Sequence, residues 1–294
     1  MYTVVSAIIV LGVLIFVHEF GHFIVAKRFD IKVLRFSLGF GPKIVGKTYG
    51  ETEYCLSVVP LGGYVKILGQ DPDEEIEAED LDRAFSRKSV WVRMAVVVAG
   101  PLFNLLLAVL IFSVVYMFGV PQLTTKIGTV NKDFPAYKAG VREGDRILAV
   151  DGRKVASWTE LSRAIRKSKG NVINLEIKRE VKIIPVRVTP MIRKTRNLFG
   201  ETIEVRMIGV TAAREITTRS VGPFRAVWMG IHRTWEIIYL TFVSIAKIIQ
   251  RVIPAKTIGG PIMIMQMAGQ QAREGVVNFL LFMALISINL GILN

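Results

Sequence analysis

Charge is almost absent from the start of this sequence. Between residues 2 and 26 the only charged side chain is Glu19, and the only imidazoles are His18 and His22. No basic segment precedes this apolar run and no cleavage site of small residues follows it, so a cleaved signal peptide is disfavoured. A bilayer span needs about 20 mostly apolar residues. We therefore expect a first membrane span from Thr3 to Ala26.

Disulfides, acidic residues and nucleic-acid motifs are scarce or missing as well. The single cysteine, Cys55, excludes an internal disulfide. The formal net charge is +14, and residues 121–275 carry the excess, with 27 Lys/Arg against 12 Asp/Glu. Without a nucleic-acid motif, this excess indicates attraction to anionic lipid headgroups or a plain solvated surface, and nucleic acid is not expected as a partner. A hydrophobic content of 51% and a mean hydropathy of +0.44 predict several membrane spans.

The first predicted span contains the pattern H-E-x-x-H. Residues four apart share a face of a helix, so His18 and His22 can present two imidazoles to one metal ion. Glu19 lies beside that face, where it can act as a general base. An acid and two imidazoles at membrane depth are costly, with about 3 kcal/mol for the acid on insertion scales, and such residues usually mark function. A chance match in a signal peptide is the weaker alternative.

The rest of the chain predicts a multi-pass α-helical membrane protein with a membrane-associated β-element and one inserted domain of mixed strands and helices. The run Ala139-Gly140-Val141 to Val150-Asp151-Gly152 resembles a PDZ domain. We therefore expect the inserted domain to be a periplasmic PDZ-like domain of the α+β class. The predicted divisions are a first transmembrane helix at 1–27, a β-element at 28–68 that is either a small soluble sheet or membrane-reentrant, an acidic and mobile cytoplasmic loop at 69–93, a second transmembrane helix at 94–120, the PDZ-like domain at 121–190, a post-PDZ region at 191–274, and a third transmembrane helix, truncated, at 275–294.

An amphipathic helix is expected within the post-PDZ region, at residues 225–253. Its charged side chains and His232 fall within one arc of a helical projection, and its longest uncharged run is ten residues, too short to cross a bilayer. We expect it to lie on the outer membrane surface with His232 on its polar face. The third span then enters from outside and ends, at Asn294, on the cytoplasmic side near His18 and His22.

Several motifs together are similar to the site-2 protease family, and to its bacterial branch that regulates sigma-E. They follow the family's order and cover nearly the whole chain: His18 to His22, Pro60-Leu61-Gly62-Gly63-Tyr64-Val65-Lys66, Gly100-Pro101-Leu102-Phe103-Asn104, the PDZ-like run, Gly259-Gly260-Pro261, and Asn289 to Asn294.

The resemblance implies a zinc-dependent intramembrane protease that cleaves single-span substrates such as anti-sigma factors and remnant signal peptides. It makes His18 and His22 zinc ligands, Glu19 the catalytic base, and places the third ligand, an aspartate, beyond Asn294. It also implies that Gly62, Gly63 and Tyr64, within the β-element, and Asn294 bind substrate. The implied location is the bacterial inner membrane, with the N-terminus and the PDZ-like domain on the periplasmic side.

Because the chain ends before the expected third ligand, a second reading stays open. In that reading the protein is a catalytically inactive membrane adaptor, a pseudoprotease that binds peptides through its PDZ-like domain. The expected partners are transmembrane peptide substrates, the lipid bilayer and, at the PDZ-like domain, periplasmic peptides. Zinc bound to the purified protein would separate the two readings.

Overall fold

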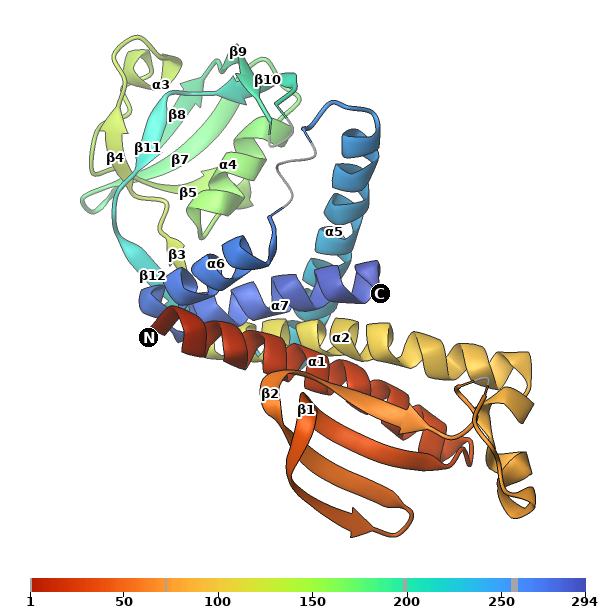
Figure 1. Ribbon diagram of the computed structural model, residues 1–294. Helices are drawn as coiled ribbons and strands as arrows, with labels where there is room; N and C mark the ends of the chain where they lie inside the picture. The colour runs from red at the N-terminus through yellow and green to blue at the C-terminus, as the bar shows by residue number, and fades with distance from the viewer. Residues whose placement is uncertain (1, 72, 198–199, 255–258) are drawn as a thin grey trace. The chain divides into compact units, whose positions relative to one another are not determined.

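The computed structural model describes residues 2–71, 73–197, 200–254 and 259–294. It divides the chain into two compact units (Figure 1). The membrane unit comprises Met1–Met117, Val221–Ala246 and Pro254–Asn294. The PDZ-like unit comprises Phe118–Ser220 and Lys247–Ile253.

In the described part of the chain, three helices are long and apolar enough to cross a bilayer: α1 (Tyr2–Arg28), α2 (Val90–Phe118) and α7 (Val276–Leu293). They coincide with the three predicted spans, so the protein is a membrane protein with several candidate spans. α1 and α2 cross closely, since a Cβ on Gly21 would lie 2.6 Å from the Ala99 carbonyl oxygen. That close crossing brings the H-E-x-x-H turn of α1 against Gly100 of α2.

The β-element consists of two long antiparallel strands, β1 (Val33–Tyr49) and β2 (Thr52–Ile67). Residues 35–38 of β1 are paired on both sides, with residues 63–66 of β2 and with residues 53–56. β1 bends at Gly39 and Gly41, where both glycines adopt positive φ. One apolar cluster joins the strand ends to α1 and α2 and fixes the sheet beside the H-E-x-x-H motif. Its buried members are Ala26, Ile31, Val33, Ile67 and Val96.

The segment predicted as a mobile acidic loop is tied to the rest of the membrane unit. It contains two short 3-10 helices, η1 (Ala78–Arg83) and η2 (Phe85–Arg87). Arg83 reaches Asp30 at 3.0 Å and Glu51 at 2.7 Å, and Lys32 pairs with Asp80. The hydrogen bond from Arg83 holds the pKa of the Glu51 carboxyl at about 2. The composition of the segment shows its acidic residues. It does not show that Lys32, which precedes β1, lies beside Asp80.

The PDZ-like unit surrounds one aliphatic core. Its main sheet has the order β6-β5-β7-β8, and Ile173, Leu175 and Ile177 alternate inward along β7. Further pairs join β11 to β4, β10 to β9 and β12 to β3. The elements are β3 (Val120–Leu123), β4 (Ile127–Val130), α3 (Pro135–Lys138), β5 (Arg146–Val150), β6 (Arg153–Lys154), α4 (Trp158–Lys167), β7 (Ile173–Arg179), β8 (Lys182–Val188), β9 (Met191–Arg196), β10 (Thr202–Met207), β11 (Val210–Ala212) and β12 (Ile216–Arg219).

This unit extends past the predicted boundary at residue 190. β11 returns to pair with β4, and β12 pairs with β3 directly after α2. These strands are short, and their partners lie about 80 to 100 residues earlier, so local alternation does not reveal them.

Two further helices complete the membrane unit, α5 (Pro223–Ile249) and α6 (Pro261–Glu274). α5 occupies most of the predicted amphipathic segment and is not among the candidate spans. Its Gly230 packs against Ser113, five residues before α2 ends, and Thr241 donates a hydrogen bond to Asn289 of α7. α6 packs along α1, where Gly269 meets Thr3. The placement of α5 on the membrane surface stays a prediction.

Candidate functional site

His18 and His22 lie one turn apart on α1 and bring their ring nitrogens together. Their Nε2 atoms are 3.2 Å apart, and the ring planes cross at 82°. Two nitrogens bound tetrahedrally to one zinc ion at about 2.0–2.1 Å lie roughly 3.3 Å from each other. The observed spacing therefore fits two imidazoles that share a metal ion.

The second nitrogen of His22 is held by the backbone of α2. Its Nδ1 lies 2.7 Å from the Val96 carbonyl oxygen, which can only accept a hydrogen bond. With the hydrogen on Nδ1, the lone pair of Nε2 is free for a metal ion, the arrangement typical of metal-binding histidines. This contact cannot be predicted from the sequence, because any residue at position 96 has the same carbonyl group.

Gly100 explains how α2 comes close enough to the two histidines. A Cβ at this position would lie 2.7 Å from His18 Cε1 and Nε2, and it would also collide with His22 Nε2. Both imidazoles occupy the space that a side chain would need. Gly100, which the sequence shows only as part of a family motif, lies directly over the pair of ring nitrogens.

Glu19 points from the same turn toward the end of β2. Its carboxylate is hydrogen-bonded to the Val65 backbone, and its Cγ lies 3.8 Å from the position of a Cβ on Gly63. A cavity of about 310 Å³ opens here. Its lining contains the base and one histidine from α1 together with β2, loop and α2 residues: Glu19, His22, Tyr64, Val65, Ile67, Gln70, Phe85, Val96 and Val97.

The last part of β2 presents a strand edge to this cavity. Residues 63–67 pair with β1 on one side only, whereas residues 53–56 are paired on both sides. Gly63 is packed so tightly that a Cβ would meet the Ser37 carbonyl oxygen. The Tyr64 hydroxyl accepts a hydrogen bond from Arg35 at 3.2 Å. An extended chain could add to this edge within reach of Glu19.

Two predicted site residues lie apart from this cluster. Gly62 is buried with φ at +155° and packs against the Phe40 ring, so it shapes the bend before the strand edge. Asn294 is exposed at the end of α7, where its backbone N–H donates to the Leu290 carbonyl. His232 is exposed on α5, as expected of a surface residue.

No third metal ligand accompanies the histidines within the described ranges. Among these residues no group of three or more His, Cys, Asp or Glu side chains is placed to hold a metal ion. A catalytic zinc site takes three protein ligands and keeps one open position. His18 and His22 would supply two of those three.

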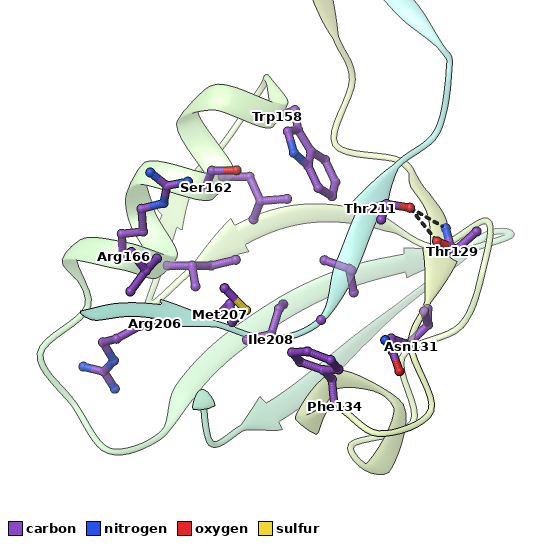
Figure 2. Close-up of a pocket in the computed structure, with 16 residues that line it drawn as sticks. Thr129, Asn131, Phe134, Trp158, Ser162, Arg166, Arg206, Met207, Ile208 and Thr211 are labelled. Carbon is purple, nitrogen blue, oxygen red and sulfur yellow. Dashed lines mark hydrogen bonds between the residues drawn. The ribbon is translucent and has the colours of Figure 1, made fainter. Parts of the chain in front are cut away.

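A second cavity, of about 630 Å³, lies within the PDZ-like unit. α4 lines one side with Trp158, Leu161, Ser162, Ile165 and Arg166, and residues 205–211 line the other. Figure 2 shows Phe134, Met207 and Ile208 on its floor, with the hydrogen-bonded pair Thr129 and Thr211 at one end. A groove between a helix and a strand segment, apolar at its centre, suits an extended peptide.

Known proteins resemble the chain over its whole length. "Putative zinc metalloprotease R01501" of Rhizobium meliloti (strain 1021) is 35% identical, over 100% of this chain and 82% of that protein. "Regulator of sigma-E protease RseP" of Salmonella typhimurium (strain 14028s / SGSC 2262) is 30% identical, over 100% of this chain and 87% of that protein.

The PDZ domain of an SdrC-like protein from Listeria monocytogenes matches 30% of this chain and 84% of that structure, at 23% identity and a TM-score of 0.24. The model of Peptidase family M50 matches residues 6–294. The chain therefore belongs to Peptidase family M50, the site-2 protease family.

Proposed function

We propose that this protein is a zinc-dependent protease that cleaves the membrane-spanning segments of single-span proteins. The observation that carries the proposal is the pair of Nε2 atoms 3.2 Å apart on α1, with Glu19 beside them at an open strand edge. All three side chains belong to a helix that can span the bilayer. Relatives named as zinc metalloproteases support the same chemistry.

Each of the three residues has a distinct part in this proposal. His18 and His22 hold the metal ion through Nε2, and a bound zinc ion supplies Lewis acidity that polarises a peptide carbonyl and a water molecule. Glu19 takes the proton from the attacking water and then gives it to the leaving amine. A third ligand is still required, and the expectation that an aspartate beyond Asn294 supplies it stays a prediction.

The substrate is proposed to bind as an extended strand along residues 63–67 of β2. A peptide bond inside a helix is shielded by the helix's own hydrogen bonds and side chains, so the substrate must first lose helical structure. The edge at residues 63–67 offers backbone groups that replace those bonds, and Val65 places that edge at Glu19. Gly63 and Tyr64 therefore contribute to substrate binding through their backbone groups, which form part of this strand edge.

Metal analysis together with a cleavage assay tests the central proposal. The purified full-length protein should contain about one zinc per chain and cleave a single-span substrate in detergent or liposomes. His18→Ala and His22→Ala should each lose both properties, and His232→Ala, which removes the exposed histidine of α5, should retain both. Cleavage that continues in zinc-free protein would refute the proposal.

Disulfide crosslinking tests the strand pairing separately. With Cys55 replaced by serine, a cysteine at Tyr64 should crosslink to substrate cysteines at every second position, the period of a β-strand. A cysteine at Lys47, on the far strand segment of the sheet, is the matched control and should not crosslink. A period near 3.6 residues at Tyr64 would show that the substrate stays helical.

Peptide binding at the PDZ-like unit is the second function that a specific observation favours. The cavity between α4 and residues 205–211 suits a peptide. A peptide could bind there whether or not the chain is catalytic. A protein that binds peptides there, yet holds no zinc and cleaves nothing, would be the membrane adaptor of the alternative reading. The substrates, the inner-membrane location and the periplasmic side of the PDZ-like unit remain parts of the proposal.

A further inference from the structure

The feature of the membrane unit that the proposed function leaves unexplained is the side chain of Asn104. It lies on α2, one turn after Gly100, and is 1% exposed. Its Nδ2 atom is 3.4 Å from Nδ1 of His18, and its Oδ1 atom is buried without a hydrogen-bond partner among the described residues.

Either orientation of the amide leaves one of its two ends without a partner among the described residues, so the choice between the two orientations depends on His18. The two ends of a carboxamide have nearly the same size, so a turn of 180° exchanges Oδ1 and Nδ2 without moving any other atom. Oδ1 then faces Nδ1 of His18 and accepts a hydrogen bond from it. The hydrogen of the neutral imidazole is thereby placed on Nδ1, and Nε2 keeps a free lone pair.

The same pattern holds the other histidine. His22 Nδ1 meets the Val96 carbonyl oxygen, and with the amide turned His18 Nδ1 meets the Asn104 side-chain oxygen, so that each ring is oriented by an oxygen from α2. If the Asn104 amide had the opposite orientation, its N–H would donate to His18 Nδ1. The hydrogen of the neutral imidazole would then be on Nε2. That hydrogen would lie between the two Nε2 atoms, where a metal ion has to bind.

We propose that Asn104 is a positioning residue that orients His18 for metal binding through its side-chain oxygen. The inference rests on the proposed zinc site and names the residue that prepares it. α7 keeps Asn104 in place, because Ser287 donates a hydrogen bond to the Asn104 backbone oxygen at 2.7 Å. Gly291, one turn further on, lets α7 lie close to the Pro101 carbonyl.

Zinc affinity of the purified full-length protein is the first test. Asn104→Leu, which keeps the size and removes the acceptor, should weaken zinc binding about 10- to 100-fold in chelator competition. Asn104→Asp keeps an acceptor oxygen and should restore most of that affinity. Ser113→Ala removes another buried polar group from α2, one that bonds only within its own helix, and should bind zinc as the parent protein does.

The visible spectrum of cobalt-substituted protein is recorded for the same variants, because a role in packing alone would leave the metal geometry unchanged. Asn104→Leu should shift this spectrum and Asn104→Asp should not. Parental affinity and spectrum in Asn104→Leu would overturn the proposal. So would an equal loss in both variants, since that result assigns Asn104 to packing.

Nitrogen NMR of histidine-labelled protein tests the orientation of His18 without any variant at Asn104. In the zinc-free parent, His18 should carry its hydrogen on Nδ1, and a hydrogen on Nε2 would overturn the proposal. Three histidines in the chain make the assignment simple, with His232→Gln removing one signal. A parent protein that binds no zinc would refute the proposed function, while this measurement would still decide the role of Asn104.

Discussion

The two units of this protein use small and polar side chains differently in their interiors. In the PDZ-like unit the interior is aliphatic, with Ile147, Ile173 and Ile177 fully buried. On α2 of the membrane unit the buried positions include Ala99, Gly100, Asn104, Ala108 and Ser113. Large apolar side chains of the same helix face outward, among them Val97, Leu102, Leu106 and Leu110.

This difference follows from the solvent around each unit. Water drives aliphatic side chains into the PDZ-like core, whereas lipid is as apolar as leucine and gives no such drive. Helices in lipid instead approach through small residues and hydrogen-bonding groups. The interior of the membrane unit is thus available for imidazoles, an amide and a carboxylate, and the candidate site is built from them.

The largest expected effect is that of Glu19→Gln on cleavage. Glutamine keeps the shape of the side chain but cannot take a proton, so cleavage of a single-span substrate should fall by about 10²- to 10⁴-fold. Zinc content and the stability of both units should not change, because Glu19 is not placed as a ligand. Gln70→Ala, which alters the lining of the same cavity, should stay within a few-fold of the parent. Near-normal turnover by Glu19→Gln would remove Glu19 from the mechanism.

Truncation of an aliphatic side chain should have unequal consequences at a core position of the PDZ-like unit and on the outward face of α2. Ile177→Ala opens a cavity in the PDZ-like core and should lower the free energy of unfolding of that unit by about 2–5 kcal/mol. Leu106→Ala removes a side chain of similar size from the outward face of α2, where it is 53% exposed, and should cost far less. Urea unfolding followed by near-UV circular dichroism measures both variants. Equal losses would contradict the proposed contrast between the interiors.

Gly100→Ala should be more harmful than its single methyl group suggests. The added carbon overlaps both imidazoles, and overpacking of this kind typically costs about 1–3 kcal/mol. Because the rings must move apart, zinc content should fall even where the protein still folds. Gly222→Ala is the control, since a Cβ there meets no atom within 4 Å. Full zinc occupancy in Gly100→Ala would show that the helices separate without disturbing the site.

A smaller effect is expected from acid on the PDZ-like unit. Burial alone would raise the pKa of Asp145, but hydrogen bonds from Arg179 Nε and the Arg142 backbone N–H, both at 2.8 Å, bring it below its ordinary value. A carboxyl with a lowered folded pKa stabilises fully above its unfolded pKa of about 3.9. That contribution is lost as the pH falls from there through the folded pKa.

The urea concentration at the unfolding midpoint of the PDZ-like unit should therefore fall as the pH is lowered below about 5. Asp145→Asn should begin lower and show a flatter dependence on pH, because it has no carboxyl to protonate. An unchanged slope in that variant would assign the acid sensitivity to other carboxyls.

Local sequence patterns predicted a good part of this molecule. Three uncharged runs predicted α1, α2 and α7. The H-E-x-x-H spacing predicted that His18 and His22 share a face, because helical geometry fixes residues four apart. Resemblance to the site-2 protease family, confirmed by the family match, added the zinc chemistry.

Contacts between distant segments were beyond the reach of those patterns. Apolar side chains surround α2 on all sides, so periodicity does not show which face carries Gly100 and Asn104 inward. Asn104 meets a histidine 86 positions earlier, and Val96 contributes only its backbone. The double pairing of residues 35–38 likewise depends on bends at glycines whose φ the sequence leaves open.

The hydrogen bond from Ser287 to Asn104 has a consequence for the order of events during biosynthesis. A ribosome releases α1 and α2 well before α7, because synthesis proceeds from the N-terminus. Until α7 arrives, nothing from that helix holds the turn of α2 that carries Asn104. The nascent chain would thus fix Asn104 beside His18 only late in translation.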